Sequence, residues 1–157
     1  MEQLIFCIVI WLIVFLIIPF DRAKELRMAA VIAFIWMVFV DNASTALGYY
    51  SYLHSLISIG SAPLFQNLAE AGLGVLMINW LKENSFTKLF TVLIVGLGFI
   101  VIQNIYIKIG VFTYGSFDNT LNFIHHIAAL SIFTWLSLAV VGEKNVYTGN
   151  KSRMSIK

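Results

Sequence analysis

Five apolar runs, each long enough to cross a bilayer as a helix, dominate this chain of 157 residues. They cover residues 4–20, 28–48, 64–81, 89–109 and 121–141. Bilayer hydrocarbon is about 30 Å thick and a helix rises about 1.5 Å per residue, so a span needs roughly 17–25 residues. In lipid, backbone groups must pair within the segment, which favours helices for runs of this length. The sequence therefore predicts an all-α integral membrane bundle of about five transmembrane helices, forming one domain over residues 1–142.

Composition supports a membrane location and argues against other classes of protein. Apolar residues make up 60% of the chain and charged residues 11%, far from the mix of soluble domains. The net charge is only +2 and the basic residues are scattered, so nucleic acid is not an expected partner. The single cysteine, Cys7, excludes an internal disulfide. We expect the lipid bilayer to be the principal partner.

The basic residues also predict the orientation of the chain. Nine of the ten fall on alternate connections and on the tail: Arg22, Lys24, Arg27, Lys82, Lys88, Lys144, Lys151, Arg153 and Lys157. The positive-inside rule places these segments in the cytoplasm and the N-terminus outside. The first run lacks the basic start and the small-residue cleavage site of a signal peptide, so we expect it to be retained. The prediction is a multi-pass protein of the cytoplasmic (plasma) membrane with a flexible cytoplasmic tail over residues 143–157.

The outer connection over residues 49–63 has helical spacing of its apolar residues. Tyr49, Tyr52, Leu53, Leu56 and Ile57 follow the i, i+3, i+4, i+7, i+8 pattern. This pattern predicts an amphipathic helix lying flat in the interface. Its tyrosines, including Tyr50, are expected in the headgroup layer, where an apolar ring with a polar tip is stable.

Polar side chains inside the runs gather at one predicted depth. A carboxylate at the centre of a span costs about 3 kcal/mol, so such positions are informative. Counting about 1.5 Å per residue places Asp41, Glu70, Gln103 and His126 roughly 10 Å below the outer surface. The candidate ligand-binding residues are Asp41, Asn67, Glu70, Gln103, Asn122, His125 and His126. We predict a polar pocket open to the outside that binds a small ligand or ion, centred on Asp41, Glu70 and His126.

Other interpretations stay open. The amides can serve as hydrogen bonds between helices, as in a structural or assembly protein. A metal site is less favoured, because the adjacent His125 and His126 point about 100° apart on a helix. A membrane-embedded enzyme is also less favoured, because no nucleophile elbow, phosphate-binding loop or dinucleotide glycine pattern occurs, and we expect no cofactor. Five helices are few for a transporter acting alone, so a homo-oligomer or a subunit of a membrane complex stays open.

One segment carries a resemblance. Residues 106–114, with Lys108, Gly110, Phe112 and Tyr114 at alternate positions, resemble the lysine-x-glycine-x-phenylalanine-x-tyrosine signature of a family of small uncharacterised multi-pass membrane proteins of spore-forming Gram-positive bacteria. Asp41 near the outer end of the second run is similar too. The chain departs from the family at Gln103 (a glutamate there), at Phe117 (a tryptophan) and at residues 135–137 (Arg-Leu-His). The resemblance implies that the outer loop around residues 108–114 is a defined element, and it implies no activity.

Overall fold

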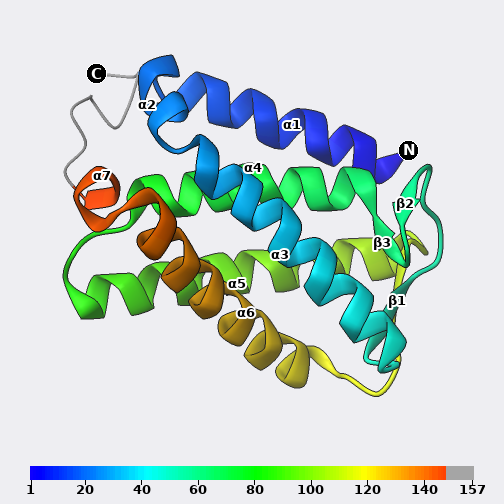
Figure 1. Cartoon of the computed structure of the whole chain (residues 1–157). Coiled ribbons are helices and arrows are strands. Elements are labelled where there is room, and N and C mark those ends of the chain that lie inside the picture. The colour runs from blue at the N-terminus through cyan, green and yellow to red at the C-terminus, as the bar shows by residue number, and fades with distance from the viewer. Residues whose placement is uncertain (148–157) are drawn as a thin grey trace.

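In the computed structural model, which describes residues 1–147, most of the chain is helical (Figure 1). The helices are α1 (Glu2–Ile17), α2 (Phe20–Glu25), α3 (Arg27–Ala46), α4 (Leu64–Trp80), α5 (Ser85–Lys108), α6 (Asn119–Val141) and α7 (Glu143–Tyr147). Four short strands are β1 (Tyr50–Tyr52), β2 (Ser58–Ile59), β3 (Ala62–Pro63) and β4 (Phe112–Tyr114). The predicted all-α class is confirmed, and the five longest helices lie on the five apolar runs.

Three helices, α3, α5 and α6, are long and apolar enough to cross a membrane. They indicate a membrane protein. Helix α1 is apolar but has 16 residues, and α4 has 17 residues and carries Gln66, Asn67 and Glu70. At about 1.5 Å per residue these two helices are about 24–26 Å long.

The helices form a bundle with two different ends. The strands and the N-terminus lie at one end, which we call the strand end, and α2 and α7 lie at the other (Figure 1). Side by side, α1 packs on α4, α4 on α3, α3 on α6 and α6 on α5. Close approach uses small residues: a Cβ at Gly74 of α4 would lie 2.8 Å from the Ala33 Cβ of α3. Helix α4 is the most buried and forms the centre of the core.

The predicted amphipathic helix over residues 49–63 is wrong, because this connection forms strands. Gly48 ends α3 with a φ of +70°, and the next residues pair β1 with β4 in antiparallel register, Tyr50 opposite Tyr114. The rest folds into the hairpin of β2 and β3, with Gly60 at a φ of +64°. The Asn42 side chain fixes this hairpin on α3, accepting from the Ser61 N–H at 2.8 Å. Tyrosine favours strands, and the edge of β4 supplies a partner.

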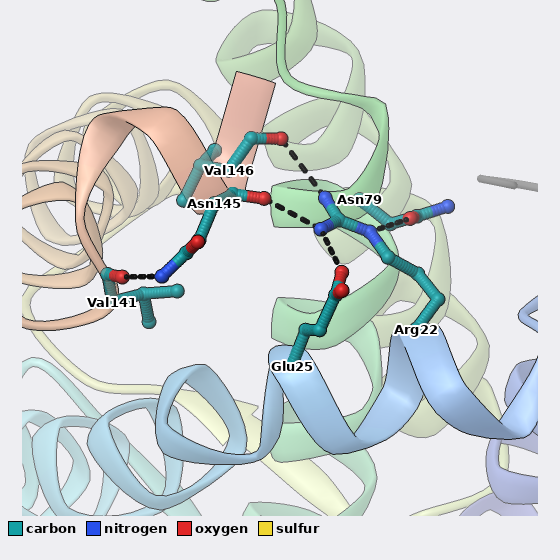
Figure 2. A network of polar contacts seen from close by, with 6 residues as sticks. All are labelled: Arg22, Glu25, Asn79, Val141, Asn145 and Val146. Carbon is teal, nitrogen blue, oxygen red and sulfur yellow. Dashed lines mark hydrogen bonds and ion pairs between the residues drawn. The ribbon is translucent and has the colours of Figure 1, made fainter. Parts of the chain in front are cut away.

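The opposite end is closed by a buried arginine. The Arg22 side chain of α2 is fully buried and donates to Asn79 Oδ1 of α4 (3.2 Å), to the Asn145 and Val146 carbonyls of α7 (2.5 and 2.9 Å) and to Glu25 Oε2 (2.9 Å) (Figure 2). The expectation of a flexible tail is wrong for residues 143–147, which form α7. A guanidinium at a helix C-terminus satisfies its last carbonyls and complements its dipole. Residues 148–157 of the predicted tail lie outside the described residues.

Candidate functional site

The first polar cluster surrounds two carboxylates near the strand end. Asp41 of α3 accepts hydrogen bonds from the Tyr50 hydroxyl (2.7 Å) and from Asn67 Nδ2 (3.1 Å). Glu70 of α4, one turn after Gln66, accepts from Gln66 Nε2 (2.8 Å). The exposed fractions of Asp41 and Glu70 are 4% and 5%. We call these five residues the acid cluster: it joins α3, α4 and β1 through hydrogen bonds to two buried carboxylates.

The acid cluster has no cationic side chain. The ion pairs of residues 1–147 are the N-terminus with Glu2 and Arg22 with Glu25, and neither reaches Asp41 or Glu70. Moving a carboxylate out of water without a partner charge costs several kcal/mol. Amide and hydroxyl donors offset only part of this cost, since each neutral hydrogen bond contributes about 1 kcal/mol. Among residues 1–147, the charge of the pair is therefore not compensated by an ion pair.

Two tyrosines of β1 report the proximity of both carboxylates. Burial raises the pKa of the Tyr50 hydroxyl well above its ordinary value, and the charges of Asp41 and Glu70 raise it further. Burial and the same two carboxylates raise the pKa of Tyr52. Tyr50, expected in the headgroup layer, is instead buried and covers the carboxylates from the strand end.

Oxygen atoms without donors lie next to the carboxylates. The Gln66 and Asn67 amides use their nitrogens to donate to Glu70 and Asp41. Gln66 Oε1 and Asn67 Oδ1 are buried and have no hydrogen-bond partner among the residues that the structure describes. A cavity of about 10 Å³ also reaches Glu70, lined on its other sides mainly by apolar residues of α3, α4, α5 and α6. A volume of this size is at the lower limit for one water molecule. Of the acid cluster, only Glu70 lines this cavity.

The second polar cluster joins α5 to α6. Gln103 Oε1 accepts from Asn122 Nδ2 and, at 3.0 Å, from His126 Nε2. Asn122 Nδ2 also donates to the Tyr114 hydroxyl (3.3 Å), which in turn donates to Asn119 Oδ1 (2.8 Å). We call these five residues the amide cluster. It contains no carboxylate, and its members meet in the geometry of hydrogen bonds between helices.

His125 belongs to neither cluster directly. Its Nε2 lies 3.0 Å from Ser44 Oγ of α3, and its ring lies edge-on to those of Tyr49 and Phe117. Ser44 and His125 line a groove of about 250 Å³ between α3 and α6. The exposed fraction of Ser44 is 1%, whereas His125 is half-buried.

The structure thus divides the predicted site residues among separate contacts. Asp41, Asn67 and Glu70 meet in the acid cluster; Gln103, Asn122 and His126 meet in the amide cluster; His125 pairs with Ser44. Within residues 1–147, no side-chain hydrogen bond or ion pair joins the acid cluster to the amide cluster, and no three His, Cys, Asp or Glu residues form a metal-binding group.

Several polar partners were missing from the predicted site. They are Ser44, Tyr50, Gln66, Tyr114 and Asn119. Ser44 and Gln66 lie one helical turn from Asp41 and Glu70, which is a readable signal. Tyr50 and Tyr114 become neighbours of the clusters only through the pairing of β1 with β4.

Comparison of the chain with protein families, with curated proteins and with solved structures finds no match. The resemblance of residues 106–114 therefore stays a prediction, although part of this segment forms the defined strand β4.

Proposed function

We propose that this chain is a multi-pass protein of the cytoplasmic membrane, with α1, α3, α4, α5 and α6 as transmembrane helices and the strand end outside. In this orientation Arg22, Lys24, Arg27, Lys82, Lys88 and Lys144 lie on the cytoplasmic side. The basic residues near α2, near the α4–α5 connection and in α7 support this orientation through the positive-inside rule.

The function that the geometry supports best is binding of a small cation by the acid cluster from the outer side. The observation that carries this proposal is the buried pair of Asp41 and Glu70, which has no cationic partner among residues 1–147. A bound cation supplies the missing charge, and Gln66 Oε1 and Asn67 Oδ1 are free to accept it. Oxygen ligands of this kind suit a proton shared between polar groups or a hard alkali ion.

Thermal unfolding of the detergent-purified protein tests the proposal. A ligand that binds only the folded state at about 100 times its dissociation constant adds about 2.7 kcal/mol of stability. If the occupant is an alkali ion, Tm rises with NaCl or KCl relative to choline chloride at equal ionic strength. If it is a proton, Tm rises as pH falls from about 9 to about 5, because the folded protein then takes up protons that the unfolded chain does not. In Glu70→Gln and Asp41→Asn, we expect the dependence of Tm on the cation or on pH to disappear while the proteins remain folded.

Glu83→Gln is the matched control, because Glu83 is an exposed carboxylate in the α4–α5 connection. It should keep the wild-type dependence. A wild-type Tm that responds to neither cation nor pH, or a response that survives in both Glu70→Gln and Asp41→Asn, removes the binding proposal. Variants at Asp41 and Glu70 that fail to fold without any such response would show that the acid cluster only holds the helices together.

A second role, holding helices together, is supported for the amide cluster. Its five side chains hydrogen bond one another across α5, α6 and β4, and neutral hydrogen bonds of this kind join helices in membranes at roughly 0.6–2 kcal/mol each. This is the structural function that the sequence left open for the amides.

Cysteine labelling tests the proposed orientation. In a Cys7→Ser background, Ser58→Cys places a thiol at the exposed β2 strand, and Glu83→Cys places one at the opposite end. A membrane-impermeant maleimide added to intact cells should label Ser58→Cys and should label Glu83→Cys only after permeabilisation. The reverse pattern would place the acid cluster on the cytoplasmic side.

A further inference from the structure

A groove between α1 and α3 combines an apolar lining with two cations. Both helices pack on α4, and α2 joins them at the end of the bundle opposite the strand end (Figure 1). The groove has a volume of about 240 Å³. Its apolar lining includes Trp11 and Phe15 of α1 and Val75 of α4, and its charged lining consists of Lys24 and Arg27.

The charged and apolar parts of this lining are separated along the groove. Lys24 lies in α2 and Arg27 is the first residue of α3, whereas Trp11 lies six residues before Ile17, the last residue of α1. At about 1.5 Å per residue, Trp11 is therefore about 9 Å from the end of α1. A phospholipid has the same order of groups, with an anionic phosphate next to a long apolar chain.

Both cations are available to an anion. Lys24 and Arg27 are exposed, and the ion pairs of residues 1–147 include neither of them. The Lys24 Nζ atom lies 4.5 Å from the centre of the Phe20 ring, which keeps it beside the groove. The carboxylates of α2 do not line the groove, and Glu25 is already paired with Arg22. The lining therefore carries two positive charges and no negative charge.

We propose that this groove binds an anionic phospholipid, with its phosphate at Lys24 and Arg27 and an acyl chain along Trp11 and Val75. The inference goes beyond cation binding by the acid cluster, and it rests only on the proposed placement of α1 and α3 in the membrane. In the proposed orientation the lipid belongs to the cytoplasmic leaflet, where basic pockets between transmembrane helices attract anionic headgroups.

A second groove shows what distinguishes the first. It has a volume of about 390 Å³, lies on α3 and α6, and is lined by Ile32, Ile35, Trp36, Phe39 and Leu136. No charged residue lines it. Acyl chains of any phospholipid suit such a surface, because their apolar contacts do not depend on the headgroup. The cations of the groove between α1 and α3 add selection for a negative headgroup.

Native mass spectrometry of the full chain, released from uncharged detergent micelles, tests the site. With equimolar phosphatidylglycerol and phosphatidylcholine, we expect the wild type to retain phosphatidylglycerol roughly tenfold more often, because both basic residues attract its charge. Lys24→Gln/Arg27→Gln should retain the two lipids equally. Lys82→Gln/Lys108→Gln is the matched control, since it also removes two exposed cations but neither lines the groove. Loss of the preference in both double variants would overturn the site.

Ala30→Phe separates a bound lipid from an anion held by the cations alone. Ala30 lines the groove, so phenylalanine fills part of the space for the acyl chain and leaves Lys24 and Arg27 in place. We expect this variant to lose the retained phosphatidylglycerol. Retention at the wild-type level would overturn the lipid site and would show that the cations attract phosphate without an acyl chain in the groove.

Tryptophan quenching gives a second measurement that does not depend on the folding of Ala30→Phe. Full chains keep only Trp11 or only Trp36, with phenylalanine at the other tryptophans. Brominated phosphatidylglycerol should quench Trp11 at a mole fraction roughly tenfold lower than brominated phosphatidylcholine does. Both lipids should quench Trp36 equally, because it lines the uncharged groove. Equal quenching of Trp11 by both lipids would overturn the proposal, independently of any Tm response of the acid cluster.

Discussion

Arg22→Met is expected to destabilise the protein by about 3–5 kcal/mol, the loss typical of breaking a buried charged network. The Arg22 guanidinium is fully buried and connects α2, α4 and α7 through four hydrogen bonds (Figure 2). Methionine fills a similar volume but leaves Asn145 and Val146 at the end of α7 without these donors. Chemical denaturation in mild detergent, followed by circular dichroism, gives the free energy of unfolding.

Two controls separate hydrogen bonding from charge. Arg22→Lys keeps the positive charge that helps to set the orientation but lacks the planar fork that reaches several acceptors at once, so we expect it to recover only part of the lost stability. Arg27→Met removes an exposed cation at the start of α3 and should have a much smaller effect. Equal losses in Arg22→Met and Arg27→Met would contradict a structural role for the buried guanidinium.

The helices were predictable because their signal is local. Length and apolar composition of a run are properties of consecutive residues, and α3, α5 and α6 appear within a few residues of their predicted bounds. Their ends follow local signals as well: Asp118 accepts from the Leu121 N–H at the start of α6, and Gly142 ends it with a φ of +88°.

The connection over residues 49–63 was not predictable from periodicity, because its structure depends on a remote partner. β1 pairs with β4, about 60 residues away, and only this pairing selects a strand over the helical spacing. In a strand, alternate side chains share a face, so Tyr50 and Tyr52 lie on the same side of β1, and the Tyr50 hydroxyl reaches Asp41. The helical interpretation concealed this contact and assigned both rings to the headgroup layer.

The sequence also could not predict that the polar residues divide into the acid cluster and the amide cluster. Depth along a helix follows from counting residues, but which helices face one another does not. The sequence therefore placed Glu70 and His126 at the centre of one pocket, whereas α4 packs on α3 and α6 brings His126 to Gln103 of α5. Arg22 was likewise read only as a loop cation, because its acceptors on α4 and α7 are more than 50 residues away.

Gln103→Leu, in the amide cluster, is the second substitution that we expect to lower the free energy of unfolding strongly. Gln103 Oε1 accepts from both Asn122 and His126, which are buried. Leucine would leave the buried His126 Nε2 without an acceptor, at about 1–3 kcal/mol, and would leave Asn122 Nδ2 only its bond to the Tyr114 hydroxyl, so we expect a loss of about 2–4 kcal/mol of unfolding free energy. The same denaturation measurement in detergent checks this value.

Thr91→Val is the control on the same helix, since Thr91 is half-buried and its hydroxyl donates to the Thr87 carbonyl within α5. It should cost less than about 1 kcal/mol. Glu70→Gln provides the comparison with the acid cluster, because it removes a charge that has no cationic side-chain partner in the described part of the chain, and it should leave the protein folded. A Gln103→Leu protein as stable as wild type would exclude the structural role of the amide cluster. A loss in Gln103→Leu together with an intact Glu70→Gln protein would show that one cluster holds the helices and that the other is free to bind.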